Sequence, residues 1–342
     1  MDMPRKAMTI QDVARYANVS AATVSRVLSA PERVAEHTRE RVIEAIQETG
    51  YTMNLAARSL RLKAAQTILV AAPKIGNPFY STIVDAVIQE AQGRGYGVLV
   101  SSGIGDDPTR WMGDHLLSNR ADGLLLFDRA LDTRQLHDLN EGGRPLPLVA
   151  AYDEVPDPKV NSVITDNRQA AVRAMRHLHA LGHRKIGHVS APSRHGTTSE
   201  RKLGYLDGMR VLGLEVRADW IFDGDYTMPS GVAAADYLMS LDSMPTAVFC
   251  GNDDMAIGLM HRLRAAGILC PRDISIMGFD DIDIGAMLDP SLTTMHQPRE
   301  QIGRRATQAL IDIIEGTGTG TDPTHIVLSS QLVERNSTAA IG

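Results

Sequence analysis

The alternation of apolar strands with amphipathic helices after Thr67 restricts the fold more than any other feature of the sequence. Apolar segments of strand length recur along this part of the chain, and helical apolar spacing separates most of them. Such an alternation predicts parallel sheets with helices on both faces. The predicted buried strands are Thr67–Ala72, Gly97–Ser101, Gly123–Phe127, Leu148–Ala151, Lys185–Ser190, Ala247–Gly251 and Ser275–Gly278.

The chain of 342 residues carries more of this pattern than one open sheet usually holds, so two lobes are expected. A ligand cleft between them should lie beyond the carboxyl ends of the strands. The glycine-rich segment 316–323 has no following lysine and no strand before it, so it is interpreted as a surface turn and not as a phosphate loop.

The first 65 residues contain helical patterns and no strand pattern. Thr9 and Asp12 have the spacing of a capping box, and Ser20 is a good N-cap for a second helix that Pro31 ends. Gly50 is expected to end a third helix. A helix, a tight turn and a second helix predict a helix-turn-helix, although the spacing alone leaves an ordinary three-helix bundle equally open.

The charge is distributed unevenly along the chain. The net charge is −6, but residues 1–65 hold ten Lys and Arg against seven Asp and Glu, so the remaining residues carry −9. A basic end on an acidic body is typical of a protein whose one end meets nucleic acid. The difference is small, and a solvated helical surface explains it equally well.

Two segments of the amino-terminal region are TIQDVARYANVSAATVSRVL (9–28) and TRERVIEAIQETGY (38–51). Both closely resemble the head of the LacI/GalR family of bacterial transcription repressors. The resemblance continues along nearly the whole chain, and the core is most similar to the cytidine and purine repressor branch. The core segments that carry it are NPFY (77–80), LGHRKI (181–186), PTAVF (245–249), NDDMAIG (252–258) and GFDD (278–281).

The resemblance implies that the second helix lies in the major groove of DNA. Arg26 is suited to guanine, alanine methyl groups to thymine methyl groups, and Ser20 and Thr23 to phosphates. Residues 54–61 resemble the family's hinge helix, which folds on DNA and wedges Leu60 into the minor groove. Met53 stands where the family often has proline. The expected DNA contacts are Thr9, Ser20, Ala21, Ala22, Thr23, Ser25, Arg26, Asn54, Ala57, Arg58, Leu60 and Arg61.

The resemblance also implies a two-lobed core like that of periplasmic sugar-binding proteins. Arginine, carboxylate and amide side chains suit the hydroxyl groups of a polyol, and aromatic rings suit the apolar face of a sugar. A sugar is the preferred effector and a nucleoside the alternative, because His195 departs from the arginine of the purine branch. The expected ligand contacts are Phe79, Tyr80, Asp166, His195, Thr197, Arg201, Tyr226, Asn252, Asp280 and Gln297.

Other chemistry has little support in the sequence. His177, His179, His183 and His188 lack the geometry of a metal site, and one carboxylate in each of the pairs 253–254 and 280–281 is expected to cap a helix. No metal, cofactor or enzymatic activity is expected. Two cysteines and no membrane span or signal peptide predict a cytoplasmic protein, associated with the nucleoid through its DNA binding.

The sequence therefore predicts a homodimeric repressor that binds a pseudopalindromic operator and responds to a small polar effector. The expected domains are a helix-turn-helix domain (1–52), a hinge (53–65) and a two-lobed core for ligand binding and dimerisation (66–342). A transport protein with the same core should lack the first sixty residues, and an α/β enzyme should show a catalytic motif that is missing here.

Overall fold

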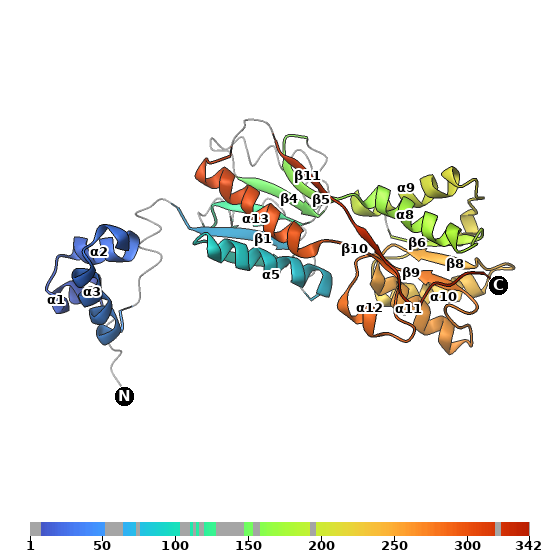
Figure 1. Cartoon of the computed structure of the whole chain (residues 1–342), viewed down its shortest axis with the longest axis horizontal. Helices are drawn as coiled ribbons and strands as arrows, with labels where there is room; N and C mark the ends of the chain where they lie inside the picture. Colours follow the sequence, from blue (N-terminus) through green and yellow to red (C-terminus); the bar gives the residue numbers. More distant parts are fainter. Residues whose placement is uncertain are drawn as a thin grey trace. The chain divides into compact units, whose positions relative to one another are not determined.

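A computed structural model of the chain describes residues 8–51, 64–72, 76–102, 110–111, 114–115, 120–127, 147–152, 158–191, 196–318 and 323–341. The chain divides into two compact units, Met1–Ala65 and Gln66–Gly342, and each is described by itself (Figure 1).

The first unit is a small three-helix domain. Its helices are α1 (Ile10–Tyr16), α2 (Ala21–Ser29) and α3 (Glu36–Thr49), with a short 3₁₀ turn, η1 (Pro31–Arg33), between the last two. The predicted capping box at Thr9, the cap at Ser20 and the left-handed Gly50 at the end of α3 are all confirmed. Val13, Val24 and Val42 are fully buried, one from each helix, so a single apolar core holds the domain together.

The first lobe of the second unit is a six-stranded parallel sheet in the order β11-β5-β4-β3-β1-β2. Alternate residues of β1 enter apolar clusters on opposite faces of this sheet. On one face, α5 (Pro78–Gly93) and α13 (Arg299–Glu315) pack against each other and the strands (Figure 1). The strands are β1 (Thr67–Ala72), β2 (Gly97–Ser102), β3 (Gly123–Leu126), β4 (Leu148–Tyr152), β5 (Asn161–Thr165) and β11 (His325–Leu328).

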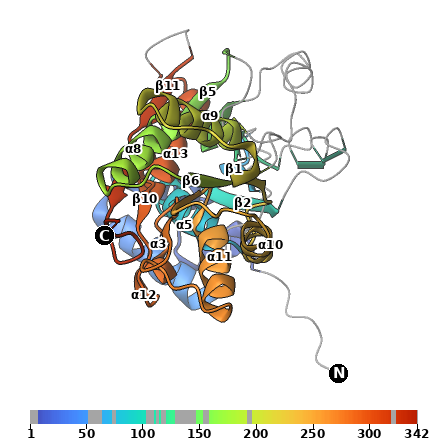
Figure 2. The same cartoon turned by 90° about the vertical axis from the view of Figure 1, so that its right-hand side faces the viewer.

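The second lobe is a four-stranded parallel sheet in the order β7-β6-β8-β9. One pair of helices, α8 (Asn167–Ala180) and α9 (Gly196–Val211), covers one face, and α10 (Met228–Met239) and α11 (Asp253–Ala265) cover the other (Figure 2). The strands are β6 (Ile186–Ser190), β7 (Ile221–Asp223), β8 (Ala247–Cys250) and β9 (Ser275–Met277), with a 3₁₀ turn, η3 (Ala218–Trp220), before β7. The predicted α/β fold with helices on both faces is confirmed.

Two glycines let α10 and α11 cross at very short range. A Cβ atom on Gly231 would lie 2.1 Å from the carbonyl oxygen of Met255, and one on Gly258 would lie 2.0 Å from that of Met228. The two contacts are reciprocal and involve backbone, which cannot swing aside as a long side chain can. The close packing of this helix pair therefore requires glycine at both positions.

The chain passes between the lobes three times: after β5, between β10 (Thr294–His296) and α13, and between β11 and β12 (Gln331–Val333). Strands β10 and β12 pair antiparallel beside the second lobe. The passages are tied together, because Thr165 donates to Gln297 at 2.9 Å and the Ser330 amide donates to Asp166 at 2.8 Å. The first lobe is thus completed by α13 and β11, which follow the second lobe in the sequence.

All seven predicted strands are confirmed, each within one residue at its ends, while β5, β7, β10, β11 and β12 were not predicted. The predicted carboxylate caps are wrong. Asn252 caps α11, and α12 (Asp283–Met287) follows Ile282 without a side-chain cap. Asp253 is instead fully buried and accepts bonds from the hydroxyl of Thr294 and the amide of Ile282.

Among the described residues, no helix is both long and apolar enough to cross a membrane. In the same part of the chain, no three His, Cys, Asp or Glu side chains are grouped as metal ligands. His183 is hydrogen-bonded to Thr246 and Ser275, and His188 lies in the apolar interior with its Nδ1 against the carbonyl of Phe249.

Candidate nucleic-acid interface and ligand site

The turn between α1 and α2 is held in one conformation. Asn18 adopts a left-handed backbone with φ of +48°, which asparagine tolerates well. Arg41 of α3 donates to the carbonyls of Ala17 and Asn18, which fixes the turn against the third helix. Ser20 accepts the amide of Thr23 at 3.0 Å and so sets the first turn of α2.

This arrangement presents the amino-terminal half of α2 to solvent. Ala22 and Arg26 are exposed, as is the cap residue Ser20, whereas Ala21, Thr23 and Ser25 are half-buried. The hydroxyls of Ser20 and Thr23 are hydrogen-bonded to each other at 2.9 Å, so one donor at most is left to meet a phosphate. The structure brings all of these predicted contacts together on one helix. The hinge residues Asn54, Ala57, Arg58, Leu60 and Arg61 lie outside the described residues.

Two residues at the ends of α1 are also exposed. Thr9 is exposed, but its hydroxyl donates to Asp12 at 2.7 Å, in addition to the two backbone bonds of the capping box between these residues. Tyr16, with 61% of its surface exposed, was not singled out in the sequence. The sequence signal that could have identified Tyr16 is an aromatic residue on the polar side of a short helix.

In the second unit, three aromatic rings meet where α5 begins and β4 ends. The ring centroids of Phe79 and Tyr152 are 4.7 Å apart, those of Phe79 and Tyr80 are 5.3 Å apart, and those of Tyr80 and Tyr152 are 5.7 Å apart. Asn77 caps α5 by accepting the amide of Phe79 at 2.8 Å, so the cap holds the first ring in place. The two predicted residues, Phe79 and Tyr80, are joined here by Tyr152, which was not predicted.

Arg201 of α9 is buried, with 1% of its surface exposed, and its side chain has several polar partners. Its guanidinium donates to Asn167 at 2.8 Å and to the carbonyl of Gly251 at 2.6 Å. It also lies 3.8 Å from the ring centroid of Phe279. Because its five N–H groups point in fixed directions, these partners determine where the remaining donors point.

Asp280 follows β9 and is buried, with one carboxylate oxygen 3.4 Å from Arg201. The same oxygen accepts from Gln297 at 2.6 Å. Burial raises the pKa of the Asp280 carboxyl to about 6, although the positive charge of Arg201 and the bond from Gln297 favour the charged form. The Asp280 carboxyl therefore binds a proton more readily than an exposed aspartate does.

Asn252 and Tyr226 lie together beside the carboxyl end of β8. The Asn252 amide oxygen caps α11 through the amide of Met255 at 2.9 Å, and its nitrogen donates to the carbonyl of Tyr226 at 3.2 Å. Asn252 is 4% exposed and Tyr226 is half-buried. Asn252 therefore orients the backbone at Tyr226, in addition to any contact that it makes with a ligand.

The remaining predicted ligand residues are placed differently. The Asp166 carboxylate accepts from Arg173 and Ser330, both at 2.8 Å, and so holds two interlobe passages together. Gln297 does the same between Thr165 and Asp280. Thr197 lies in the first turn of α9, and His195 lies outside the described residues.

Backbone strain is concentrated at this site. Among the described residues, the non-glycine residues with positive φ are Asn18, Gln66, Tyr152, Tyr226, Asp280 and Asp281. The last four lie at the carboxyl side of the strands, where the predicted ligand residues gather. Strained conformations persist where the surrounding structure imposes them, and they occur often at binding sites.

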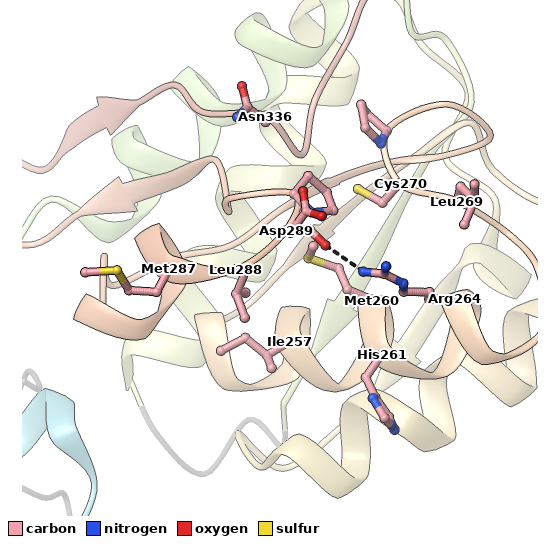
Figure 3. Close-up of a pocket in the computed structure, with 12 residues that line it drawn as sticks. Ile257, Met260, His261, Arg264, Leu269, Cys270, Met287, Leu288, Asp289 and Asn336 are labelled. Carbon is pink, nitrogen blue, oxygen red and sulfur yellow. Dashed lines mark hydrogen bonds between the residues drawn. The ribbon is translucent and has the colours of Figure 1, made fainter.

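A separate cavity of about 790 Å³ lies on the second lobe between α11, the loop after it and α12 (Figure 3). Its lining is largely apolar, and Arg264 donates to the carbonyl of Asp289 at 2.8 Å inside it. None of the predicted ligand residues lines this cavity. Its wall includes Met287, a large apolar side chain with 84% of its surface exposed.

Comparison with known proteins gives matches for both units. Residues 9–54 match the bacterial regulatory proteins of the lacI family, and residues 175–338 match a periplasmic binding protein-like domain. The HTH-type transcriptional repressor CytR of Escherichia coli (strain K12) is 35% identical over 336 residues, which cover 98% of this chain and 97% of that protein.

Two solved structures are also similar over nearly the full length. The lac repressor dimer bound to operator and the anti-inducer ONPF has a TM-score of 0.86 and 28% identity, with 98% of this chain and 100% of that chain covered. The complex of the transcriptional regulator CelR with cellobiose has a TM-score of 0.73 and 31% identity, with 96% and 99% covered.

Proposed function

Since the chain belongs to the LacI family of bacterial regulatory proteins, we propose that it binds a pseudopalindromic operator as a homodimer and releases it when a small effector binds. As a member of this family, the chain is a DNA-binding transcriptional repressor with a ligand-binding core. The observation that carries the proposal is the capped helix α2, which exposes Ala22 and Arg26 on the unit that matches the family's DNA-binding region. Footprinting on the DNA upstream of its own gene tests it, with two protected half-sites expected.

We propose a helix-turn-helix domain of residues 1–52, a hinge of residues 53–65 and a core from residue 66 onward. The division of the chain after Ala65 supports the start of the core. The proposed hinge contacts, with Leu60 as the minor-groove wedge, rest on the family resemblance alone.

Changing Arg26 to alanine is expected to weaken operator binding by roughly 1–3 kcal/mol, or about 5- to 150-fold. The exposed guanidinium is proposed to bond one guanine in each half-site, so selectivity should relax at that base pair. Gel shifts with the operator and with single-base variants at fixed salt measure both effects. Arg210→Ala removes the same charge from an exposed position of the core, and it should bind like the wild type. Equal affinities for the Arg26→Ala variant and the wild type would remove α2 as the reading helix.

The homodimer is proposed to use the apolar surface around α12. Ile284 is 51% exposed and Met287 is 84% exposed; both belong to α12, and Met287 lines the apolar cavity of the second lobe. Large exposed apolar side chains beside an apolar groove are typical of an interface, and a two-fold dimer brings one such patch against its copy. A second copy of this chain is therefore the proposed occupant.

Met287→Asp is expected to shift the protein from dimer towards monomer, because it places a charge in the proposed interface. Sedimentation velocity over a concentration series should show a lower association constant, whereas the sedimentation coefficient of the monomer should not change. Val211→Asp, a matched change of another exposed apolar residue, should leave the association unchanged. If both variants remain dimers like the wild type, the interface lies elsewhere.

We propose a carbohydrate as the effector, with a nucleoside as the second candidate. The forked donor of Arg201 and the buried acceptor of Asp280 suit adjacent hydroxyls, and the rings of Phe79, Tyr80 and Tyr226 suit the apolar face of a sugar. Asn252, Asp166, Thr197, Gln297 and His195 complete the proposed site. A thermal-shift screen over sugars and nucleosides identifies the class.

Saturating effector is expected to lower operator affinity by roughly 5- to 150-fold, which corresponds to a coupling of 1–3 kcal/mol. Induction is proposed because His195 departs from the purine branch, where the ligand is a corepressor. The effector changes the equilibrium between two lobe arrangements only if it binds one of them better. Operator affinity with and without effector at constant salt gives the sign, and tighter binding with effector would reverse it.

A further inference from the structure

The guanidinium of Arg201 reaches across from the second lobe to the first. Three of its partners belong to its own lobe: Asn167 and the Gly251 carbonyl accept hydrogen bonds, and Asp280 forms an ion pair. The fourth is the phenol oxygen of Tyr152, which accepts from Nη2 at 3.2 Å and belongs to β4 of the first lobe. One donor of the residue proposed to hold the effector is thus bonded to the opposite lobe.

The position of the Tyr152 phenol is determined by its surroundings. The residue ends β4 with φ of +74°, a conformation that tyrosine seldom adopts, and it is 7% exposed. Its ring packs against both Phe79 and Tyr80. The backbone turn and the two rings together aim the hydroxyl at Arg201, so the contact does not depend on a freely rotating side chain.

We propose that Tyr152 is a latch between the lobes. Its phenol oxygen accepts the hydrogen bond from Arg201 Nη2, and an oxygen or ring nitrogen of the effector accepts that bond instead when the effector binds. This inference rests on the proposed effector site. Of the four partners, Tyr152 is the one that lobe movement removes, because the other three move with Arg201. Binding of the effector therefore replaces the Tyr152 phenol by an effector atom as the acceptor for Arg201. A stronger bond between Tyr152 and Arg201 then means a lower affinity for the effector.

Other contacts join the lobes independently of this latch. Asn77 of the first lobe donates to Asp254 of the second at 3.1 Å. Arg299 donates to Thr82 at 3.2 Å and to the carbonyl of Asp281 at 2.9 Å. Loss of one phenol oxygen should therefore alter the balance between lobe arrangements without unfolding the core.

The test compares Tyr152→Phe with Tyr237→Phe, because each change removes one hydroxyl and keeps the ring. Tyr237 is half-buried on α10 and packs on Phe222, away from the latch. Spin labels are attached through non-natural amino acids at the exposed positions Gln89 on α5 and Ala233 on α10, one on each lobe. Pulsed electron spin resonance on full-length protein diluted with unlabelled chain then gives the distance distribution between the lobes.

Tyr152→Phe should add or enlarge a population with a different interlobe distance, whereas Tyr237→Phe should match the wild type. A Tyr152→Phe distribution that superimposes on the wild type would overturn the latch. This result needs no effector, so it stands whether or not the effector class is correct.

A second measurement tests the exchange of acceptors. Calorimetric titrations with ribose, cellobiose, cytidine and adenosine identify which of them binds the wild type. For any that binds, Tyr152→Phe should tighten binding by roughly 3- to 10-fold, because the competing acceptor is gone. Weaker binding would overturn the exchange, since the phenol would then be a ligand contact. Failure of all four to bind would count against the proposed effector class and leave the interlobe distances to decide on the latch.

Discussion

Changing Arg201 to alanine is expected to abolish the effector response and to destabilise the core by roughly 3–5 kcal/mol. The side chain is buried, and its removal leaves the Asn167 amide oxygen and the Gly251 carbonyl without their donor and the buried carboxylate of Asp280 without its positive partner. An effector in the same place would lose its forked donor as well. Thermal unfolding with and without effector measures both consequences in one series.

Two matched variants separate binding from stability. Arg201→Lys keeps the charge but loses the forked geometry, so it should retain part of the stability and still lose most of the effector response. Lys202→Ala changes the neighbouring residue, whose partly exposed ion pair with Asp223 contributes little. An undiminished effector-dependent shift in Arg201→Ala would show that the effector binds elsewhere.

Gly258→Ala is expected to destabilise the second lobe by at least about 3 kcal/mol, because the new Cβ would lie 2.0 Å from the carbonyl oxygen of Met228. Relief requires α10 and α11 to move apart, which opens the apolar cluster beneath them. At roughly 2–4 °C per kcal/mol, the melting temperature should fall by about 6–12 °C. Differential scanning calorimetry of the full chain measures this shift.

Gly93→Ala is the control for this substitution. Gly93 ends α5, a Cβ there would have no atom within 4 Å, and its φ is not positive. Alanine should leave stability unchanged or raise it by up to about 1 kcal/mol, since it restricts the unfolded chain. Equal melting temperatures for Gly258→Ala and Gly93→Ala would show that the helix crossing is looser than the structure indicates.

Local sequence predicted most of the fold. The three head helices and seven core strands have clear apolar periodicity and recognisable caps, which depend on neighbours in the sequence. Strands β10 and β12 are short and are defined by pairing with each other, while β11 is an edge strand with alternating exposure that pairs with β5. Such pairings join residues far apart in the sequence, and no local pattern specifies them.

Only part of the candidate site was predicted, because several of its contacts also join residues far apart in the sequence. Resemblance brought Arg201, Asp280 and Asn252 to one place, and the structure groups them. Tyr152 was missed because its position depends on a strained strand end and on rings from α5. Asp166 and Gln297 have structural partners at the interlobe passages, which sequence motifs do not reveal.

The late position of α13 and β11 in the sequence has a consequence for synthesis on the ribosome. Strand β5 ends at Thr165 and β11 at Leu328, so at roughly 5–20 residues per second the edge of the first sheet waits about 10–30 s for its partner. During that time the apolar face that α13 covers is open as well. A nascent chain with such a face and edge is prone to aggregate and is a natural client for chaperones. Premature stop codons before residue 299 should therefore eliminate the protein, and should not leave a DNA-binding head on a folded first lobe.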